Sequence, residues 1–393
     1  MANEIVWYDE SETGIPILNN VAGSLIAILD ACLVTGFNNK TLTSVVVTSV
    51  VAVATVTAHG YSDGKMVDIA GAGNALINGR KKITYLTANT FSFPATGVAD
   101  GAISGTITAK RSPLGWTRLH ATAATTGLWS RSDVTATAMS LRIDDTAAGN
   151  ASTTQARALM VESYTDINTF TGLSPTAAVL LNGQYWSKGA NTVTAKAWVL
   201  VGDSKTFYLF TDSTSYPSTS YAGVPSGPLV FGDIKSYKNA DPYACIIAGN
   251  TSSSGDTFGF GSTSSSTAGT AVAVTSSSLV ARAATGLGAN VGFIPLRYGT
   301  TRFGGQGPIY PSPIDNGLEI TAPVLLADGT NTFGPIRGEF RGIGDPQANL
   351  PIAVFHKQIL SNLVGSANQW LMVGYQITGS PGHLAFDITG PWA

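Results

Sequence analysis

The sequence predicts a mainly β protein, with a β-sandwich-like body, one N-terminal helix and an inserted small β-barrel domain. Three observations lead to this fold class. The 393 residues include 44 glycines and many Ser, Thr, Ala and Val, a composition that favours short strands and tight turns over helices. Only one stretch has a long helical period. The rest of the chain divides into short apolar runs bounded by turn residues.

The predicted helix lies in NNVAGSLIAILDACLVTG, residues 19–36. Its apolar residues recur at steps of three and four, so they share one face. We expect Asn19 or Asn20 to cap its start and Gly36 to end it. A second apolar segment, 351–365, fits either a shorter helix or a pair of strands. The apolar face of the first helix consists of Val21, Leu25, Ile28, Leu29, Cys32 and Leu33.

The remaining apolar runs are short and rich in β-branched and aromatic residues, as in sandwiches and barrels. In KTFYLF, Phe207 and Leu209 share one face, while Tyr208 and Phe210 share the other. This strand is therefore predicted to be buried on both faces. The strand-like runs are VVVTSVVAVATVTA, KMVDIAG, KKITYLT, TFSFP, AISGTITAK, TAMSLRIDD, ALMVESYT, KAWVLV, KTFYLF, LEITAPVLLADG and WLMVGYQIT.

These runs divide the chain into three parts. Residues 1–43 contain the helix and belong to the main β body. Residues 44–110 hold about five short strands, enough to close a small barrel. Residues 111–393 complete the body, and within them the Ser/Gly-rich tract 251–282 is expected to be a surface loop or arm. The segment 297–317 contains too many Gly and Pro residues for a regular central strand.

Charge and cysteine content exclude several classes of partner. The formal net charge is −2 and only 12% of residues are charged, so nucleic acid and anionic membranes are poor partners. The most apolar run, 45–58, is shorter than the ~20 residues of a membrane span. Cys32 and Cys245 have no CxxC partner, so we expect them to be buried, with no metal or other cofactor. No secretory signal begins the sequence, which predicts synthesis in a cytoplasm.

A Gly-Asp-Ser motif ends in Ser204 after an apolar run, a setting in which serine is the nucleophile of some esterases. Such a serine needs a histidine base and usually a carboxylate behind it. His356 and His383 lack the aspartate three residues earlier that is typical of these hydrolases. His59 lies in a predicted turn of the 44–110 part, and His120 follows the sequence GWTR.

The run that follows Ser204 is another β segment, whereas the nucleophile elbow of an esterase leads from a strand into a helix. We therefore predict a hairpin turn at this motif, in a protein that is not an enzyme. Gly202 can adopt a positive φ in such a turn, and Asp203 or Ser204 can hydrogen-bond to nearby backbone amides.

Other residues that suggest chemistry have simpler interpretations. Asp133, Asp144 and Asp145 could offer oxygen ligands to calcium, but no DxDxDG loop is present, and a strand end turning into a polar loop is favoured. The glycines at 257–262 and 303–308 lack the GK[ST] ending of a phosphate loop. No catalytic, cofactor-binding or metal-binding residue is assigned from the sequence.

The aromatic residues fit either the sugar-stacking platform of an adhesin or the core of a sandwich. A place in the core or in a subunit contact is favoured, because large aromatics usually lie inside. Tyr216 and Tyr221, in the polar segment SYPSTSYAG, are better candidates for exposed contacts. The aromatics weighed in this way are Trp116, Trp129, Trp186, Trp198, Tyr185, Tyr208, Phe207 and Phe210.

Several motifs together resemble a family of structural proteins from tailed-bacteriophage particles. They are ILDACLVTGFNNK, SPLGWTR, LRIDD, WVLVGDSKTFYLF and FGDIKSYK. The resemblance is best over residues ~17–43 and ~111–245. This chain departs from the family pattern by carrying 44–110 between the helix and GWT. That part, with TAHGYSDGKMVDIAGAGNALINGRKKITYLTANTFSF, is similar to small β domains that recur in phage tail proteins.

The resemblance implies a component of the virion, assembled in the host cytoplasm, and brings no catalytic residues. We expect copies of the chain to assemble in the tail, neck or fibre-attachment region, with other virion proteins and with one another as partners. One alternative is a tail-fibre or receptor-binding adhesin that recognises host surface glycans through 44–110 or the loop 212–228. A capsid decoration protein is another, and a hydrolase that uses Ser204 is the weakest.

Overall fold

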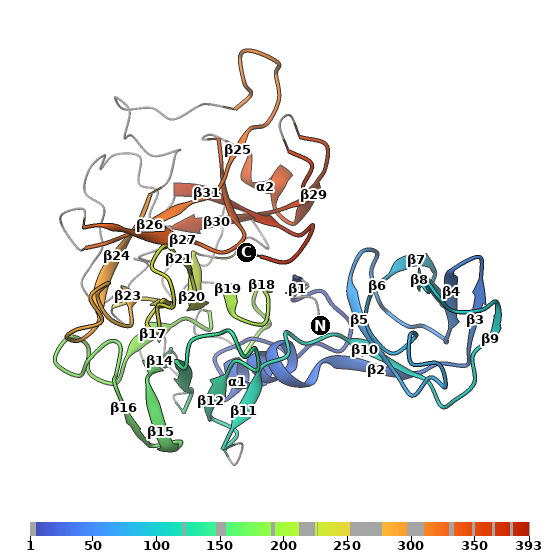
Figure 1. Cartoon of the computed structure of the whole chain (residues 1–393), viewed down its shortest axis with the longest axis horizontal. Coiled ribbons are helices and arrows are strands. Elements are labelled where there is room, and N and C mark those ends of the chain that lie inside the picture. The colour runs from blue at the N-terminus through green and yellow to red at the C-terminus, as the bar shows by residue number, and fades with distance from the viewer. Residues whose placement is uncertain are drawn as a thin grey trace.

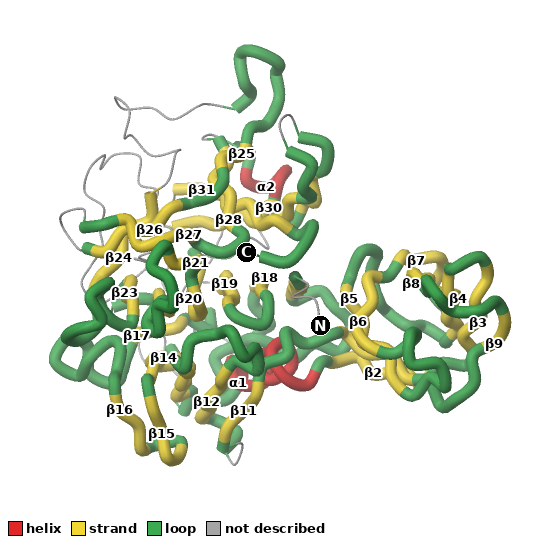
Figure 2. The backbone as a smooth tube through the Cα atoms, in the orientation of Figure 1, coloured by secondary structure: helices red, strands yellow, loops and turns green. Residues whose placement is uncertain are grey.

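The chain is known from a computed structural model, and its described residues form mainly antiparallel strands, with short helical segments (Figure 2). The Tyr216 and Tyr221 side chains, with most of 251–282 and of 297–317, lie outside the residues that the structure describes. None of the described helices is long and apolar enough to span a membrane. The described residues are 5–120, 123–146, 155–189, 193–211, 225, 227–251, 277–296, 310–329, 334–347, 350–363, 366–377 and 380–392.

A ten-stranded antiparallel sheet forms the middle layer of the body. Every residue of its strands β18, β19, β20 and β22 is buried, so both faces of the sheet are covered there. The last residues of the expected arm 251–282 belong to this sheet as a buried strand, so the arm is shorter than predicted. In spatial order the strands are β1 (Val6–Asp9), β18 (Trp198–Gly202), β19 (Thr206–Thr211), β20 (Pro228–Asp233), β22 (Cys245–Ala248), β23 (Ser278–Val280), β24 (Val291–Leu296), β26 (Leu325–Asp328), β27 (Ile336–Glu339) and β21 (Lys235–Ser236).

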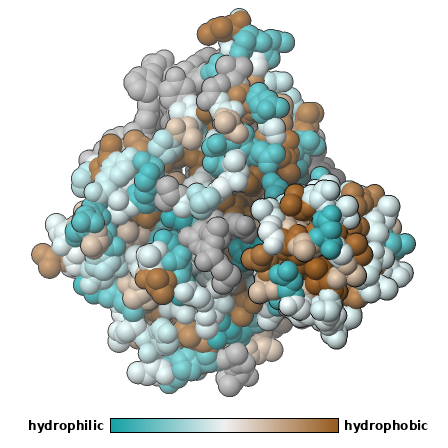
Figure 3. Space-filling model, turned by 45° about the vertical axis from the view of Figure 1, so that its right-hand side comes forward, coloured by the Kyte–Doolittle hydropathy of each residue, from teal (hydrophilic) through white to brown (hydrophobic). Residues whose placement is uncertain are grey.

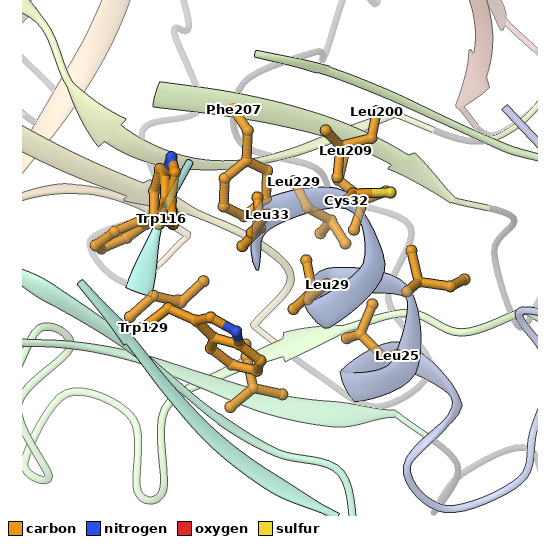
Figure 4. Packing of buried hydrophobic residues seen from close by; sticks show 14 of the residues in the cluster. Leu25, Leu29, Cys32, Leu33, Trp116, Trp129, Leu200, Phe207, Leu209 and Leu229 are labelled. Carbon is orange, nitrogen blue, oxygen red and sulfur yellow. The ribbon is translucent and has the colours of Figure 1, made fainter. Parts of the chain in front are cut away.

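One face of the middle sheet packs on a five-stranded sheet and the N-terminal helix (Figure 1). Phe207 and Leu209 point into this core, where Leu29 and Leu33 of the helix meet them (Figure 4). The packed strands are apolar on the side that faces the core, as the sandwich prediction requires. They are β11 (Thr117–Leu119), β12 (Thr126–Ser130), β13 (Ser140–Asp144), β14 (Ala156–Val161) and β17 (Gln184–Trp186), and a hairpin of β15 (Ser163–Asp166) and β16 (Thr169–Thr171) follows β14.

The opposite face of the middle sheet packs on a C-terminal sheet. Tyr208 and Phe210 point into this second core, so β19 is buried on both faces as predicted. The segment 351–365, for which the sequence left a short helix or a pair of strands open, contains a single helical turn followed by a short strand. The elements of this layer are β25 (Ile320–Thr321), β28 (Ile343–Pro346), α2 (Ile352–Phe355), β29 (Gln358–Leu360), β30 (Trp370–Ile377) and β31 (Ser380–Asp387).

The N-terminal helix begins later than the sequence predicts. It consists of α1 (Ser24–Leu29) and a wider π-helical segment, η1 (Asp30–Thr35). Neither Asn19 nor Asn20 caps it, because the residue at the cap is Gly23, which has no side chain to do so. Gly36 ends the helix as predicted: its φ is 71°, and its N–H donates to the Ala31 carbonyl at 2.9 Å.

Residues 37–111, which we call the module, form two further sheets around a core of their own (Figure 1). The chain enters along β2 and leaves along β10, and these two strands pair, so both ends of the module lie together beside the helix. The first sheet contains β2 (Phe37–Thr41), β10 (Thr108–Arg111), β5 (Met66–Ala70) and β6 (Gly79–Lys82). The second contains β7 (Thr84–Thr87), β8 (Thr90–Pro94), β4 (Val51–Thr55), β3 (Ser44–Thr48) and β9 (Gly101–Ala102).

Candidate interaction site on the module

The Gly-Asp-Ser motif lies at the tip of the hairpin that joins β18 to β19, as predicted. Asp203 closes the turn, since its Oδ1 accepts the backbone N–H groups of Lys205 and Thr206 at 2.8 and 2.9 Å. Gly202 is part of β18 and does not adopt the positive φ that we expected. The Ser204 hydroxyl donates to Asp133 Oδ2 at 3.0 Å. A strand follows the serine where an esterase would have a helix.

Asp203 also connects the layers of the body. Its second carboxylate oxygen accepts a hydrogen bond from the guanidinium of Arg341, which follows β27. Its main-chain carbonyl accepts the indole N–H of Trp116 at 3.0 Å. Asp203 is fully buried, so each of these contacts replaces water that the turn has lost. Through Asp203 the motif therefore connects the hairpin to two other segments of the body.

The four histidines make their contacts in different parts of the fold. His59 is buried in the module, where its ring bonds to the Thr87 carbonyl at 2.8 Å. The His120 ring lies edge-on to that of Tyr164. In the C-terminal layer, His356 Nδ1 accepts a backbone N–H, and the His383 ring lies edge-on to a phenylalanine. Each of these contacts is made within the ring's own region of the fold.

The three aspartates considered for calcium serve separate local roles. Asp133 accepts the hydroxyls of Thr135 and Ser204, and Asp144 accepts that of Thr146. Asp145 is fully buried and accepts the Leu25 N–H at 3.0 Å, so it caps the helix from a distant part of the chain. Within the described ranges, no group of three potential ligands is close enough together to hold a metal ion.

Asp145 also forms an ion pair with the ammonium group of Lys188, and both side chains are fully buried. Lys188 Nζ in turn donates to the Val21 carbonyl, at 3.1 Å, in the loop before the helix. Burial raises the pKa of Asp145 to about 6, although Lys188 and the N–H groups of Leu25 and Ile26 oppose that shift.

The large aromatics fill the cores, as the favoured interpretation predicts. Trp116, Trp129, Trp186, Trp198, Phe207, Tyr208 and Phe210 are at most 3% exposed. Tyr185 is half-buried, and the Arg157 guanidinium lies 3.5 Å from its ring centroid. These rings therefore do not form an exposed platform on which a sugar could stack.

A cluster of buried charges, which we call the junction, joins the module to the body. Lys65 and Arg111 belong to the module, while Asp9 and Glu12 belong to β1 and the turn after it. Lys65 Nζ lies 2.8 Å from Glu12 Oε1 and 3.7 Å from Asp9 Oδ2, and Arg111 Nε donates to Glu12 Oε2. All four side chains are at most 7% exposed. Removal of one partner from such a buried pair costs about 3–5 kcal/mol, because it leaves an uncompensated charge in the interior.

Lys65 is closely surrounded within the junction. Its ammonium lies 2.9 Å from the centroid of the Trp7 ring and donates to the Trp7 carbonyl. Burial lowers the pKa of Lys65 to about 8, while Glu12 and Asp9 act in the opposite direction. A cavity of about 110 Å³ adjoins this group. The chain's own carboxylates already neutralise the cation, so the cavity offers no free charge from Lys65 to a ligand.

The second sheet of the module presents an uncharged surface, which we call the open face. Its central row crosses all five strands and consists of Thr84, Ser92, Val53, Val46 and Ala102, each opposite the next. The flanking rows hold Thr48, Val51 and Pro94 on one side, and Ser44, Thr55 and Thr90 on the other.

The three rows of the open face carry apolar and hydroxyl side chains only, and the Asp100 carboxylate accepts the Ser49 N–H at the end of the sheet. The segments 41–62 and 83–99 contain no Lys, Arg, Asp or Glu. Val46 and Val51 are 42% and 43% exposed. Hydrophobic residues gather on the surface of the module, on the right of Figure 3. Contiguous exposed apolar area often marks an interaction surface, so the adjacent exposed valines make the open face the candidate site.

Comparison with known proteins does not assign a function to this geometry. No protein-family model and no curated protein matches the chain. Among solved structures, the phage phi92 endosialidase matches over 89% of this chain and 52% of its own, with 11% sequence identity and a TM-score of 0.17. The chain thus spans about half the length of that structure, and a TM-score of this size does not indicate a shared fold.

Proposed function

We propose that this protein is a structural component of a tailed-phage virion, assembled in multiple copies in the tail, neck or fibre-attachment region. The motifs quoted above supply the link to phage particles. The single observation that supports a structural role is the open face, an uncharged sheet surface that the buried junction holds in a fixed orientation on the body. A surface with these properties suits contact with a neighbouring subunit.

The adhesin alternative has less support among the described residues. Aromatic rings usually provide the flat apolar surface for a sugar, and the tryptophans considered for that role are buried in the cores. The three rows of the open face contain no aromatic residue. Tyr216 and Tyr221, the candidates for exposed contacts, lie outside the described residues.

Purified particles from a phage that encodes this chain test the proposal. Quantitative mass spectrometry of gradient-purified particles should find the chain in several copies per particle, at a ratio fixed by the symmetry of its site. Immunogold labelling should locate it at the tail or neck. Absence from intact particles would overturn the proposal.

Point substitutions separate the structural role from adsorption better than removal of 44–110. That deletion removes Lys65 and leaves Glu12 without one of its buried cations, so the body itself would be disturbed. A charge placed at Val46 leaves the junction intact. Loss of particle assembly in such a variant favours the structural role, whereas intact particles that no longer adsorb to cells favour the adhesin.

A further inference from the structure

The open face has the chemistry of a surface that meets a copy of itself. In a two-fold symmetric contact the same patch is used on both chains, so residues near the axis face their own copies. A charged residue there would meet a like charge. The three rows of the open face contain no charged residue at all, so the face is free of that repulsion.

Its polar groups are also self-complementary. Apart from alanine, proline and valine, the rows contain only Ser and Thr, among them Ser92 in the central row and Thr48 and Thr55 beside it. A hydroxyl both donates and accepts, so it can hydrogen-bond to another copy of itself. A lysine or a carboxylate cannot. The combination of exposed valines and hydroxyls therefore fits an identical face better than a charged partner.

The size of the face limits the strength of such a contact. Three strands of five residues, β7 with four and β9 with two, at about 4.8 Å spacing and about 3.4 Å per residue, cover on the order of 300 Å². A stable dimer usually buries about 800 Å² per partner. The contact should therefore be weak between free chains and become strong only where an assembly holds several chains together.

We propose that two copies of this chain associate through their open faces, with the central rows around Val46 and Val53 facing each other as two stacked sheets. This inference names the partner of the surface used in the proposed function and so rests on it. Antiparallel sheets pack face to face in this manner about 10 Å apart, with their side chains interdigitated.

Sedimentation velocity of the full chain tests the contact. From about 10 µM to about 1 mM the wild-type protein should pass from monomer to dimer. Val46→Glu and Val46→Lys should each weaken association at least about tenfold, because like charges then face each other. An equimolar mixture of the two variants should restore it. Val134→Glu, at a valine that is 97% exposed elsewhere, is the matched control and should leave association unchanged.

The mixture also shows that the variants are folded, since only folded faces can pair. A wild-type chain that stays monomeric throughout this range, a Val46→Glu chain that dimerises normally, or a mixture that fails to associate would each overturn the self-contact. The virion role is judged separately, by the presence of the chain in purified particles. Each proposal can therefore fail while the other stands.

Discussion

The Lys65 ammonium of the module and the Glu12 carboxylate of the body are 2.8 Å apart and almost fully buried. Arg111 reaches the other oxygen of the same carboxylate. Glu12 is therefore shared between two cations, whereas Lys65 has Asp9 as a second, more distant partner. Because of this asymmetry, substitution of Glu12 and substitution of Lys65 should lower the free energy of unfolding by different amounts.

Glu12→Gln should destabilise the protein more than Lys65→Met. The glutamine leaves two buried cations without their shared anion, which costs about 3–5 kcal/mol. The methionine leaves Glu12 paired with Arg111 and Asp9 with Lys357 at 3.8 Å. It can also keep contact with the Trp7 ring, so the cost should be about 1–3 kcal/mol. Urea unfolding at pH 7 measures both values. Equal losses, or a larger loss for Lys65→Met, would contradict a shared carboxylate.

The hairpin tip provides a second comparison. Asp203→Ala removes two hydrogen bonds within the turn and leaves the buried Arg341 without its carboxylate, so we expect a loss of about 3–5 kcal/mol. Ser204→Ala removes one part-buried hydroxyl bond and should cost only about 0.5–1.5 kcal/mol. Any esterase activity that a preparation shows should be the same in the Ser204→Ala protein. Activity lost with the serine would restore the nucleophile hypothesis.

The fold class and the hairpin were accessible from the sequence because both depend on local patterns. Alternation of apolar residues in KTFYLF predicts burial on both faces, and the structure confirms it for Phe207 and Tyr208. The same kind of alternation in 45–58 is the signal for the open face. What it does not reveal is which side of the strands remains uncovered, because that depends on the packing of the two sheets.

The helix start and the junction were not accessible, because their partners are distant in the sequence. Asn19 is a reasonable cap by residue type, but the carboxylate that serves the helix is that of Asp145, more than 100 residues later. Glu12, Lys65 and Arg111 likewise come from three separate segments. A local pattern cannot show that three such charges meet in the interior.

Gly36 is a position where the backbone conformation should decide stability. Its φ is 71°, and a Cβ there would lie inside van der Waals distance of the Arg111 carbonyl oxygen, where the chain leaves the module. Gly36→Ala should therefore lower the midpoint of thermal unfolding by several degrees, with a cost of about 1–3 kcal/mol. Gly390→Ala is the matched control, because nothing lies within 4 Å of a Cβ there and its φ is not positive.

Asp145 should give stability an unusual pH dependence. Its pKa is about 6 in the folded chain, above the ordinary value of 3.8. Between about pH 4 and pH 6 the folded state holds a proton that the unfolded chain has released, so the contribution of this group to stability falls as the pH rises through that window. The change amounts to about 2–3 kcal/mol.

Asp145→Asn isolates this contribution, because asparagine does not titrate and can still accept the Leu25 N–H. Urea unfolding of both proteins at several pH values between 4 and 7.5 gives the difference in their free energies of unfolding. The other carboxylates act equally on both proteins and cancel in that difference. The wild-type protein should lose stability relative to the variant as the pH rises from about 4 to about 6. A difference that stays constant would mean that Lys188 and the helix N–H groups balance burial at this carboxylate. A difference that grows in favour of the wild type would mean that they outweigh it.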